Sequence, residues 1–200
     1  MKSRAEESRL AKENLLQGLR EADAFLSHIS NSMKVSLVPG SGDPTTYNLP
    51  QQPIHKNLLP RSCAFDSFSS LPNPSISEIS DNGMEILMSS GATISDLMHY
   101  TSINDPLDAA ELCLKSRNIA PTAPDTLACY PFISEDPFII EHSPHVFAIG
   151  NQDKFDSRTI SDHKVSTLVL TIPNFQTSGS LVLLNTNSLE SRVVDFNCAS

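Results

Sequence analysis

The sequence has 200 residues, of which 39% are hydrophobic and 18% are charged, with 14 prolines and no tryptophan. Its 14 basic and 23 acidic side chains give a formal net charge of −9. This acidity excludes a protein that holds nucleic acid by its own positive charge, because non-specific affinity for nucleic acid comes mostly from clustered lysine and arginine. The net charge does not exclude a role as a subunit of a complex that handles DNA. The length is enough for one domain with a core of its own.

The cysteines and the first residues bear on the compartment. Four cysteines lie far apart, without a Cys-x-x-Cys pair, at Cys63, Cys113, Cys129 and Cys198. Residues 1–7 are charged and lead into no apolar run typical of a signal peptide. No segment approaches the ~18 apolar residues that a membrane span needs. We therefore expect an intracellular protein with free thiols, in which each cysteine is a small buried hydrophobe.

An amphipathic helix is predicted over residues 3–29. Its apolar residues recur at spacings of three and four, at Leu15, Leu19, Ala22, Leu26 and Ile29. Leu16 and Phe25 widen this stripe, and the charged side chains, Asp23 among them, lie mostly off it. This pattern is typical of a helix packed on a sheet, so we expect Leu15, Leu19, Leu26 and Ile29 to be buried. A dimerising coiled coil is the alternative, but polar residues 30–32 interrupt the repeat.

A short strand is predicted at 33–38, followed by a glycine-rich loop at 39–44. Loops at the carboxyl end of a strand often hold ligands in α/β proteins. The loop is not a P-loop, because the Lys and Ser/Thr that should follow the glycines are missing. Residues 44–62 are expected to be extended, since four prolines punctuate them.

A hairpin is predicted next, with strands at 76–79 and 84–88 around an Asn-Gly turn. Thr93 or Ser95 is expected to cap a short helix that ends near Tyr100. Asp105, followed by a proline at the first helical position, is expected to cap a second helix that runs to about Arg117. The proline-rich segment that follows has the composition of an ordered loop.

The last third of the chain is predicted to be mostly strands. Five strands are expected, at residues 138–140, 146–149, 167–172, 180–184 and 192–196. The nearly continuous aliphatic run at 168–172 indicates a strand inside a sheet, and the end of the chain has the pattern of a β meander. No repeat and no second domain are evident.

Three stretches together resemble one family. They are residues 39–45 with 49–55, 119–132 with 136–138, and 143–151 with 168–175. The most specific strings are Pro-Thr-Ala-Pro-Asp-Thr-Leu at 121–127, and Pro-His-Val-Phe at 144–147 followed by Gly-Asn at 150–151. In this order, over nearly the whole chain, they resemble the small (second, B-type) regulatory subunits of eukaryotic replicative DNA polymerases, specifically of the delta polymerase.

The resemblance implies a fold of the α+β or α/β class. Family members carry a calcineurin-like phosphoesterase domain, in which a two-sheet β-sandwich is flanked by helices, and an oligonucleotide-binding barrel. We expect residues 1–200 to be the C-terminal portion of an inactive phosphoesterase-like domain, with the barrel and the first strands preceding Met1. The strand at 33–38 would then lose a neighbour, and its open edge would favour aggregation.

The resemblance also bears on catalysis. Active phosphoesterases of this fold hold two metal ions through four motifs built from Asp, His and Asn. The third motif, Gly-Asn-His-Asp/Glu, corresponds to Gly-Ser-Gly-Asp at 40–43, and the fourth, Gly-His-x-His, to Gly-Asn-Gln-Asp at 150–153. The first two motifs would lie before Met1 or are absent. Amides and hydroxyls replace imidazole poorly on a transition metal, so no catalytic, cofactor-binding or metal-ligating residue is predicted.

Other candidate groups are weaker. The histidines considered as ligands are His55, His99, His142, His145 and His163. Pro144 lies between His142 and His145, so these two histidines cannot share a helix face. We interpret all five histidines as surface or loop residues. No Gly-x-Ser-x-Gly elbow is present, and the basic residues form no stripe with aromatic ones.

Two functions follow from these observations. The first is a noncatalytic scaffold subunit of the nuclear delta polymerase complex. The resemblance implies as its partners the cysteine-rich C-terminal module of the catalytic subunit and a third accessory subunit, with DNA contacted only through the complex and no membrane. The alternative is a residual metal-dependent phosphoesterase, which bound metal and phosphodiester hydrolysis would reveal.

Overall fold

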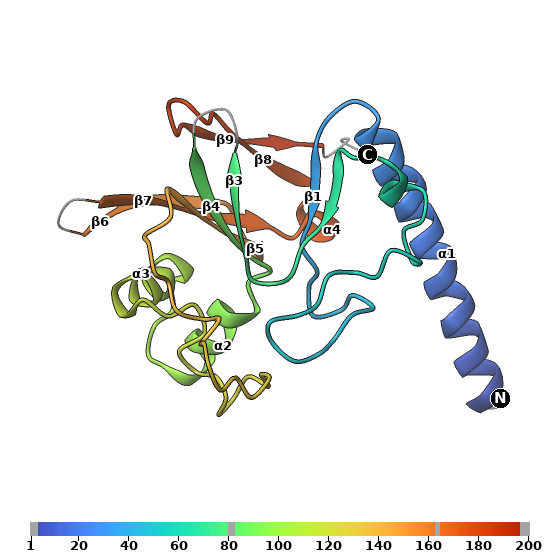
Figure 1. Ribbon diagram of the computed structural model, residues 1–200, viewed down its shortest axis with the longest axis horizontal. Helices are drawn as coiled ribbons and strands as arrows, with labels where there is room; N and C mark the ends of the chain where they lie inside the picture. Colours follow the sequence, from blue (N-terminus) through green and yellow to red (C-terminus); the bar gives the residue numbers. More distant parts are fainter. Residues whose placement is uncertain (1–3, 80–82, 163–164, 197–200) are drawn as a thin grey trace.

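The computed structural model describes residues 4–79, 83–162 and 165–196 (Figure 1). The first part of the chain forms α1 (Arg4–Ser30), β1 (Val35–Leu37), the short 3-10 helix η1 (Ser62–Ala64), β2 (Phe68–Ser70), β3 (Ser75–Ile79), β4 (Met84–Ser89), α2 (Ala92–Tyr100) and α3 (Pro106–Ser116). The remainder forms β5 (Val146–Gln152), β6 (Asp156–Asp162), β7 (Val165–Pro173), α4 (Phe175–Ser178), β8 (Ser180–Leu184) and β9 (Ser191–Asp195). Across these three ranges, no helix combines the length and the apolar character that crossing a bilayer demands.

A five-stranded mixed sheet is the centre of the fold. Its order is β3-β4-β5-β7-β6, with parallel pairing of β5 to β4 and β7 and antiparallel pairing at both edges. The pairs β1–β2 and β8–β9 form two smaller sheets. The expected mixture of helices and strands is confirmed. The two-sheet sandwich stays a prediction, because the described strands hydrogen-bond as three sheets.

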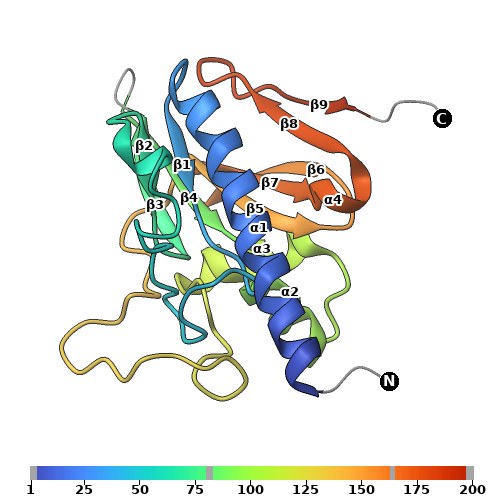
Figure 2. The same cartoon turned by 90° about the vertical axis from the view of Figure 1, so that its right-hand side faces the viewer.

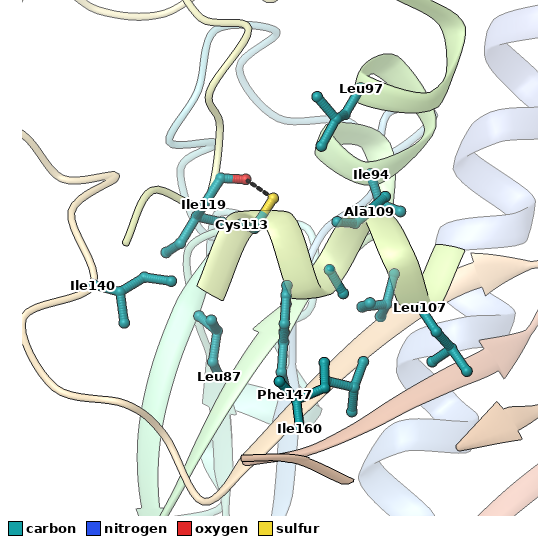
Figure 3. Packing of buried hydrophobic residues seen from close by; sticks show 13 residues of the cluster. Leu87, Ile94, Leu97, Leu107, Ala109, Cys113, Ile119, Ile140, Phe147 and Ile160 are labelled. Carbon is teal, nitrogen blue, oxygen red and sulfur yellow. Dashed lines mark hydrogen bonds between the residues drawn. The ribbon is translucent and has the colours of Figure 1, made fainter. Parts of the chain in front are cut away.

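The two faces of the central sheet are covered differently. Alternate side chains of a strand point to opposite faces. Phe147 and Val169 lie on the face that α2 and α3 cover, and they belong to the main hydrophobic core (Figure 3). Val146 and Leu168, their neighbours in sequence, lie on the other face in a smaller cluster, against which Leu184 of β8 packs. The sheet therefore has helices on one side and a strand pair on the other.

Several predicted elements are confirmed and others are wrong. The β3–β4 hairpin, α3, β5 and β7–β9 lie close to their predicted positions. The strand expected at 138–140 is wrong: backbone hydrogen bonds tie that segment to residues 117–119 after α3 instead, with one isolated bridge. Strands β2 and β6 were not predicted. The polar sequence of β6 suits an edge strand but carries little apolar alternation.

The helix starts show one success and one error. The Asp105 side chain accepts a hydrogen bond from the Leu107 N–H at 3.2 Å, and Pro106 is the first helical residue of α3, as predicted. Helix α2 instead begins after Gly91, with no side-chain cap, so the capping role predicted for Thr93 or Ser95 is wrong.

The cysteines that the structure describes are all free. Cys113 is buried in the main core, where burial raises the pKa of its thiol to about 12. Cys129 is half-buried. Cys63 is exposed, so its predicted burial is wrong. Cys198 lies outside the described residues.

Helix α1 stands largely apart from the sheet, and only its C-terminal end lies beside β1 (Figure 1, Figure 2). Leu15 is 51% exposed, so its predicted burial is wrong. Leu19 and Ile29 are half-buried, and Leu26 packs against a small cluster that includes Leu59. The helix thus contacts the domain through its last turns rather than along its whole stripe.

Helix α1 also contacts the segment at η1 through a buried carboxylate side chain. Asp23 is only 3% exposed. Its Oδ1 accepts hydrogen bonds from the N–H of Ser62 at 2.8 Å and from the Ser62 hydroxyl at 2.7 Å, and its Oδ2 accepts from the Arg61 N–H at 3.0 Å. Burial alone would raise the pKa of Asp23, but these hydrogen bonds together outweigh it and lower the pKa. Asp23 was predicted on the polar side, so this placement is a correction.

Replacing Asp23 with alanine should destabilise the contact between α1 and η1 by about 1.5–3 kcal/mol, since the buried donors of Ser62 and the partly buried N–H of Arg61 lose their charged acceptor. Hydrogen exchange at η1 and the thermal unfolding midpoint measure this loss. The exposed Glu21 on the same helix supplies the control, Glu21→Ala, which should change stability by less than about 0.5 kcal/mol. Equal effects of the two substitutions would contradict the prediction.

The same contact has a predicted pH dependence. The pKa of Asp23 is lower in the folded chain than its ordinary value of 3.8. Its contribution to stability is therefore fully present above pH 3.8 and is lost as the pH falls through the lower, folded pKa. The stability difference between the native chain and Asp23→Ala should accordingly narrow in acid.

Candidate functional site

The two loops that the resemblance equates with metal motifs, residues 40–43 and 150–153, meet in the fold. The first follows β1, and the second begins within β5, next to the end of β4. A Cβ atom on Gly40 would lie 3.5 Å from Nδ2 of Asn151 and 3.9 Å from Cβ of Ser90. The loops converge at the carboxyl ends of three strands, where α/β proteins commonly hold ligands.

The backbone just after β4 lies very close to the backbone of β5 at this point. Gly91 has a φ of +93°, and a Cβ atom there would lie 2.1 Å from the carbonyl oxygen of Gly150. Asn151 has a φ of +53°, a conformation that asparagine tolerates better than most residues. From there its Nδ2 donates to the carbonyl of Ser90 at 3.0 Å. The β4 and β5 ends are thus joined by packing and by a hydrogen bond.

Amide and hydroxyl side chains form a hydrogen-bonded network where these loops meet. The Nδ2 of Asn73 donates to Oγ of Ser90 and to Oε1 of Gln51, both at 2.7 Å. Its Oδ1 accepts from the Ser90 N–H at 3.0 Å, and Gln51 donates to the Gly40 carbonyl at 3.2 Å. Asn73 is 2% exposed and Gln51 5%. Over the described part of the chain, every buried side-chain nitrogen or oxygen has a partner, so these groups bind one another.

The donors at this place do not fit a pair of metal ions. Oδ2 of Asp43 accepts from the Gly40 N–H at 2.7 Å, and Asp153 is exposed. Within the described ranges, no three His, Cys, Asp or Glu side chains group closely enough to hold an ion. Amide N–H groups are donors and cannot ligate a cation, and oxygen ligands from amides and hydroxyls suit transition metals poorly. These residues support no metal-assisted step, and the network serves to hold the loops together.

The predicted loop and surface histidines do not gather around this network. His55 and His145 each accept a backbone N–H at Nδ1, at 3.2 and 3.1 Å. His99 contacts a neighbouring tyrosine ring edge-on, and His142 is exposed. His163 lies outside the described residues.

Three residues of the network were not singled out from the sequence as site residues: Gln51, Asn73 and Ser90. A buried polar residue in a loop has the same sequence appearance as an exposed one, so periodicity offers no signal for it. A weak signal was available in the quoted string at 49–55, which contains Gln51.

Comparison with known proteins identifies the family. The family model that matches residues 2–157 is the one for the B subunit of DNA polymerases alpha and epsilon. The chain belongs to this B-subunit family. A relative from Arabidopsis thaliana is 40% identical over 184 residues, and one from Oryza sativa subsp. japonica is 36% identical over 184 residues. One from Saccharomyces cerevisiae is 33% identical over 213 residues, and all three are named DNA polymerase delta small subunit.

The matches cover 92% of this B-subunit chain but only 41–43% of each of these three relatives. The chain therefore spans about two fifths of the length of the curated relatives it matches. The resemblance drawn from the sequence strings is confirmed at the level of the B-subunit family.

Proposed function

We propose that the chain acts as a noncatalytic accessory subunit of the nuclear DNA polymerase delta complex, as a scaffold in DNA replication. The names of its relatives support this function. The observation that supports the noncatalytic part is the network around Asn73, in which amides and hydroxyls bind one another beside the loops that the resemblance equates with metal motifs.

The proposed partners are the cysteine-rich C-terminal module of the delta catalytic subunit and a third accessory subunit. DNA would be reached only through the complex. Ordered loops suit such a role, because a surface with fixed backbone shape loses little conformational entropy when it binds. The proline-rich loop after α3 is ordered in this sense: Leu49 pairs with Cys129 through an isolated bridge, and Ala120 and Phe138 pack in the same small cluster.

We also propose that residues 1–200 form the C-terminal portion of the inactive phosphoesterase-like domain, with the barrel elsewhere in the whole protein. The length of the relatives supports this. So does a groove of about 750 Å³ on the sheet face away from α2 and α3, lined by apolar side chains such as Leu37, Met88 and Ile172. The chain alone should then enhance the fluorescence of an apolar dye, and co-expression with the rest of the protein should remove that signal. Unchanged dye binding would refute this division.

Co-purification tests the scaffold function. A tagged chain expressed with the catalytic subunit's C-terminal module should retain it in stoichiometric amount. The same preparation should contain no stoichiometric Mn or Zn and should not hydrolyse a generic phosphodiester. Failure to retain the module, together with metal-dependent turnover, would replace the scaffold by the phosphoesterase.

Substitutions in the two loops that the resemblance equates with metal motifs provide a second test of the noncatalytic function. Asp43→Asn and Asp153→Ala should leave the polymerase activity of the reconstituted complex unchanged, because within the described residues neither carboxylate belongs to a group of three His, Cys, Asp or Glu side chains that could hold an ion. Asparagine at position 43 keeps an acceptor for the Gly40 N–H. A loss of activity with the thermal unfolding midpoint intact would show that one of these residues takes part in chemistry.

A further inference from the structure

A second groove lies between the β3–β4 hairpin and the loop that precedes β5. Its volume is about 690 Å³. Four carboxylates line it: Glu85, Glu135, Asp136 and Glu141. No Lys or Arg is among its lining residues, and His142 is its only basic side chain. We call this surface the acidic groove.

The fraction of acidic residues that line this groove is higher than the fraction of acidic residues in the whole chain. The chain has 23 acidic residues in 200, whereas four of the eleven lining residues are acidic. A proportional share of eleven residues would be 11 × 23/200, or roughly one. Like charges that share a concave surface raise the local negative potential and attract cationic ligands.

The acidic groove is also apolar. Ile76 on β3 and Ile139 in the loop are each 53% exposed, and Phe132 is 48% exposed. These large side chains come from β3 and from the loop that precedes β5, and they line one concave surface. Exposed apolar residues that gather in this way mark interaction sites more often than scattered ones do. Aromatic side chains in particular act as anchors in protein interfaces.

These two features select one kind of occupant. A cationic small molecule would satisfy the carboxylates but would leave the apolar side chains wet, and an apolar ligand would bury carboxylates without partners, which is unfavourable. A nucleic acid is repelled by the charge. A peptide segment with lysine or arginine on either side of an apolar residue matches both, since charge complementarity steers the encounter and the apolar residue supplies contact area.

We propose that the acidic groove binds a basic segment of a partner protein, with an apolar residue of that segment against Phe132 and its cationic side chains against Glu135 and Glu141. This goes beyond the scaffold function, because it rests on the groove alone and not on which complex contains the chain.

The test uses the full chain, held in solution by a fused maltose-binding protein. The probe is a fluorescein-labelled peptide of lysines around a central leucine, and fluorescence anisotropy reports binding. Glu135→Lys with Glu141→Lys should weaken binding by about tenfold. Asp136 is kept, because its carboxylate accepts the Phe138 N–H at 2.9 Å and orders the loop. Added salt should weaken binding to the native chain, since exposed charges are screened.

Two controls separate this groove from general acidity. Asp66→Lys reverses an exposed carboxylate outside the groove and should leave the affinity unchanged. Phe132→Ala should weaken binding several-fold at constant charge. The thermal unfolding midpoint of each variant shows that it is folded. Absence of saturable binding, an equal effect of Asp66→Lys, or no effect of Phe132→Ala would each overturn the proposal, as would tighter binding of single-stranded DNA than of the peptide.

Discussion

Phe147→Ala should lower the free energy of unfolding by about 3–5 kcal/mol, the largest loss we expect from a single truncation in this chain. Phe147 is 0% exposed and lies on β5, the middle strand of the five-stranded sheet. Figure 3 shows it beside Ile160, pointing toward the helix that carries Cys113. The substitution removes an aromatic ring from between two layers that cannot close over the space, so a cavity remains.

The exposed Phe25 on α1 provides the matched control for this truncation. It is 64% exposed, and Phe25→Ala should change stability by less than about 0.5 kcal/mol. Denaturant unfolding of both variants, followed by circular dichroism, measures the difference. If both truncations cost the same, the layer between the sheet and α3 is not the core of the molecule.

Gly91→Ala should destabilise the chain by about 2–5 kcal/mol through two effects that act together. A side chain at φ +93° is strained by about 1–2 kcal/mol. The added methyl group would also lie 2.1 Å from the Gly150 carbonyl oxygen and 2.6 Å from Nε2 of Gln152. Because the first of these atoms is backbone, the β4 and β5 ends must separate, which adds about 1–3 kcal/mol.

This substitution should also open the network beside the loops at 40–43 and 150–153, because the Ser90 segment that it displaces binds Asn73 and Asn151. Hydrogen exchange of the Ser90 N–H reports that opening directly. Gly42→Ala is the control in the same region, since no atom lies within 4 Å of its added Cβ. A near-neutral Gly91→Ala, or an equally harmful Gly42→Ala, would contradict this account of the close approach.

Helix α3, the β3–β4 hairpin and strands β8 and β9 were predictable because their signals are local. The cap at Asp105 and the proline after it act on the first turn of the same helix. In the hairpin, Gly83 has a φ of +65°, which glycine supplies without strain. The family resemblance also came from the sequence, since short strings in a fixed order are specific without any structure.

Other features depend on residues that meet only after folding. Helical periodicity predicts Asp23 on the polar side of α1. In the fold its carboxylate is buried and accepts the N–H of Ser62, which is 39 residues away along the chain. Strand β6 forms because the edge of β7 accepts it, not because its own sequence alternates. The segment at 138–140 looked like a strand, but its hydrogen bonds go to the end of α3.

The family and the local elements could be predicted from the sequence alone, because both depend on residue identity or near-neighbour spacing. Which polar side chains meet where the loops at 40–43 and 150–153 converge depends on the folded chain. Gln51, Asn73, Ser90 and Asn151 come from four separate segments, and a buried amide is stable only where a distant partner completes its hydrogen bonds. These partners lie on other segments of the chain, so no local pattern predicts them.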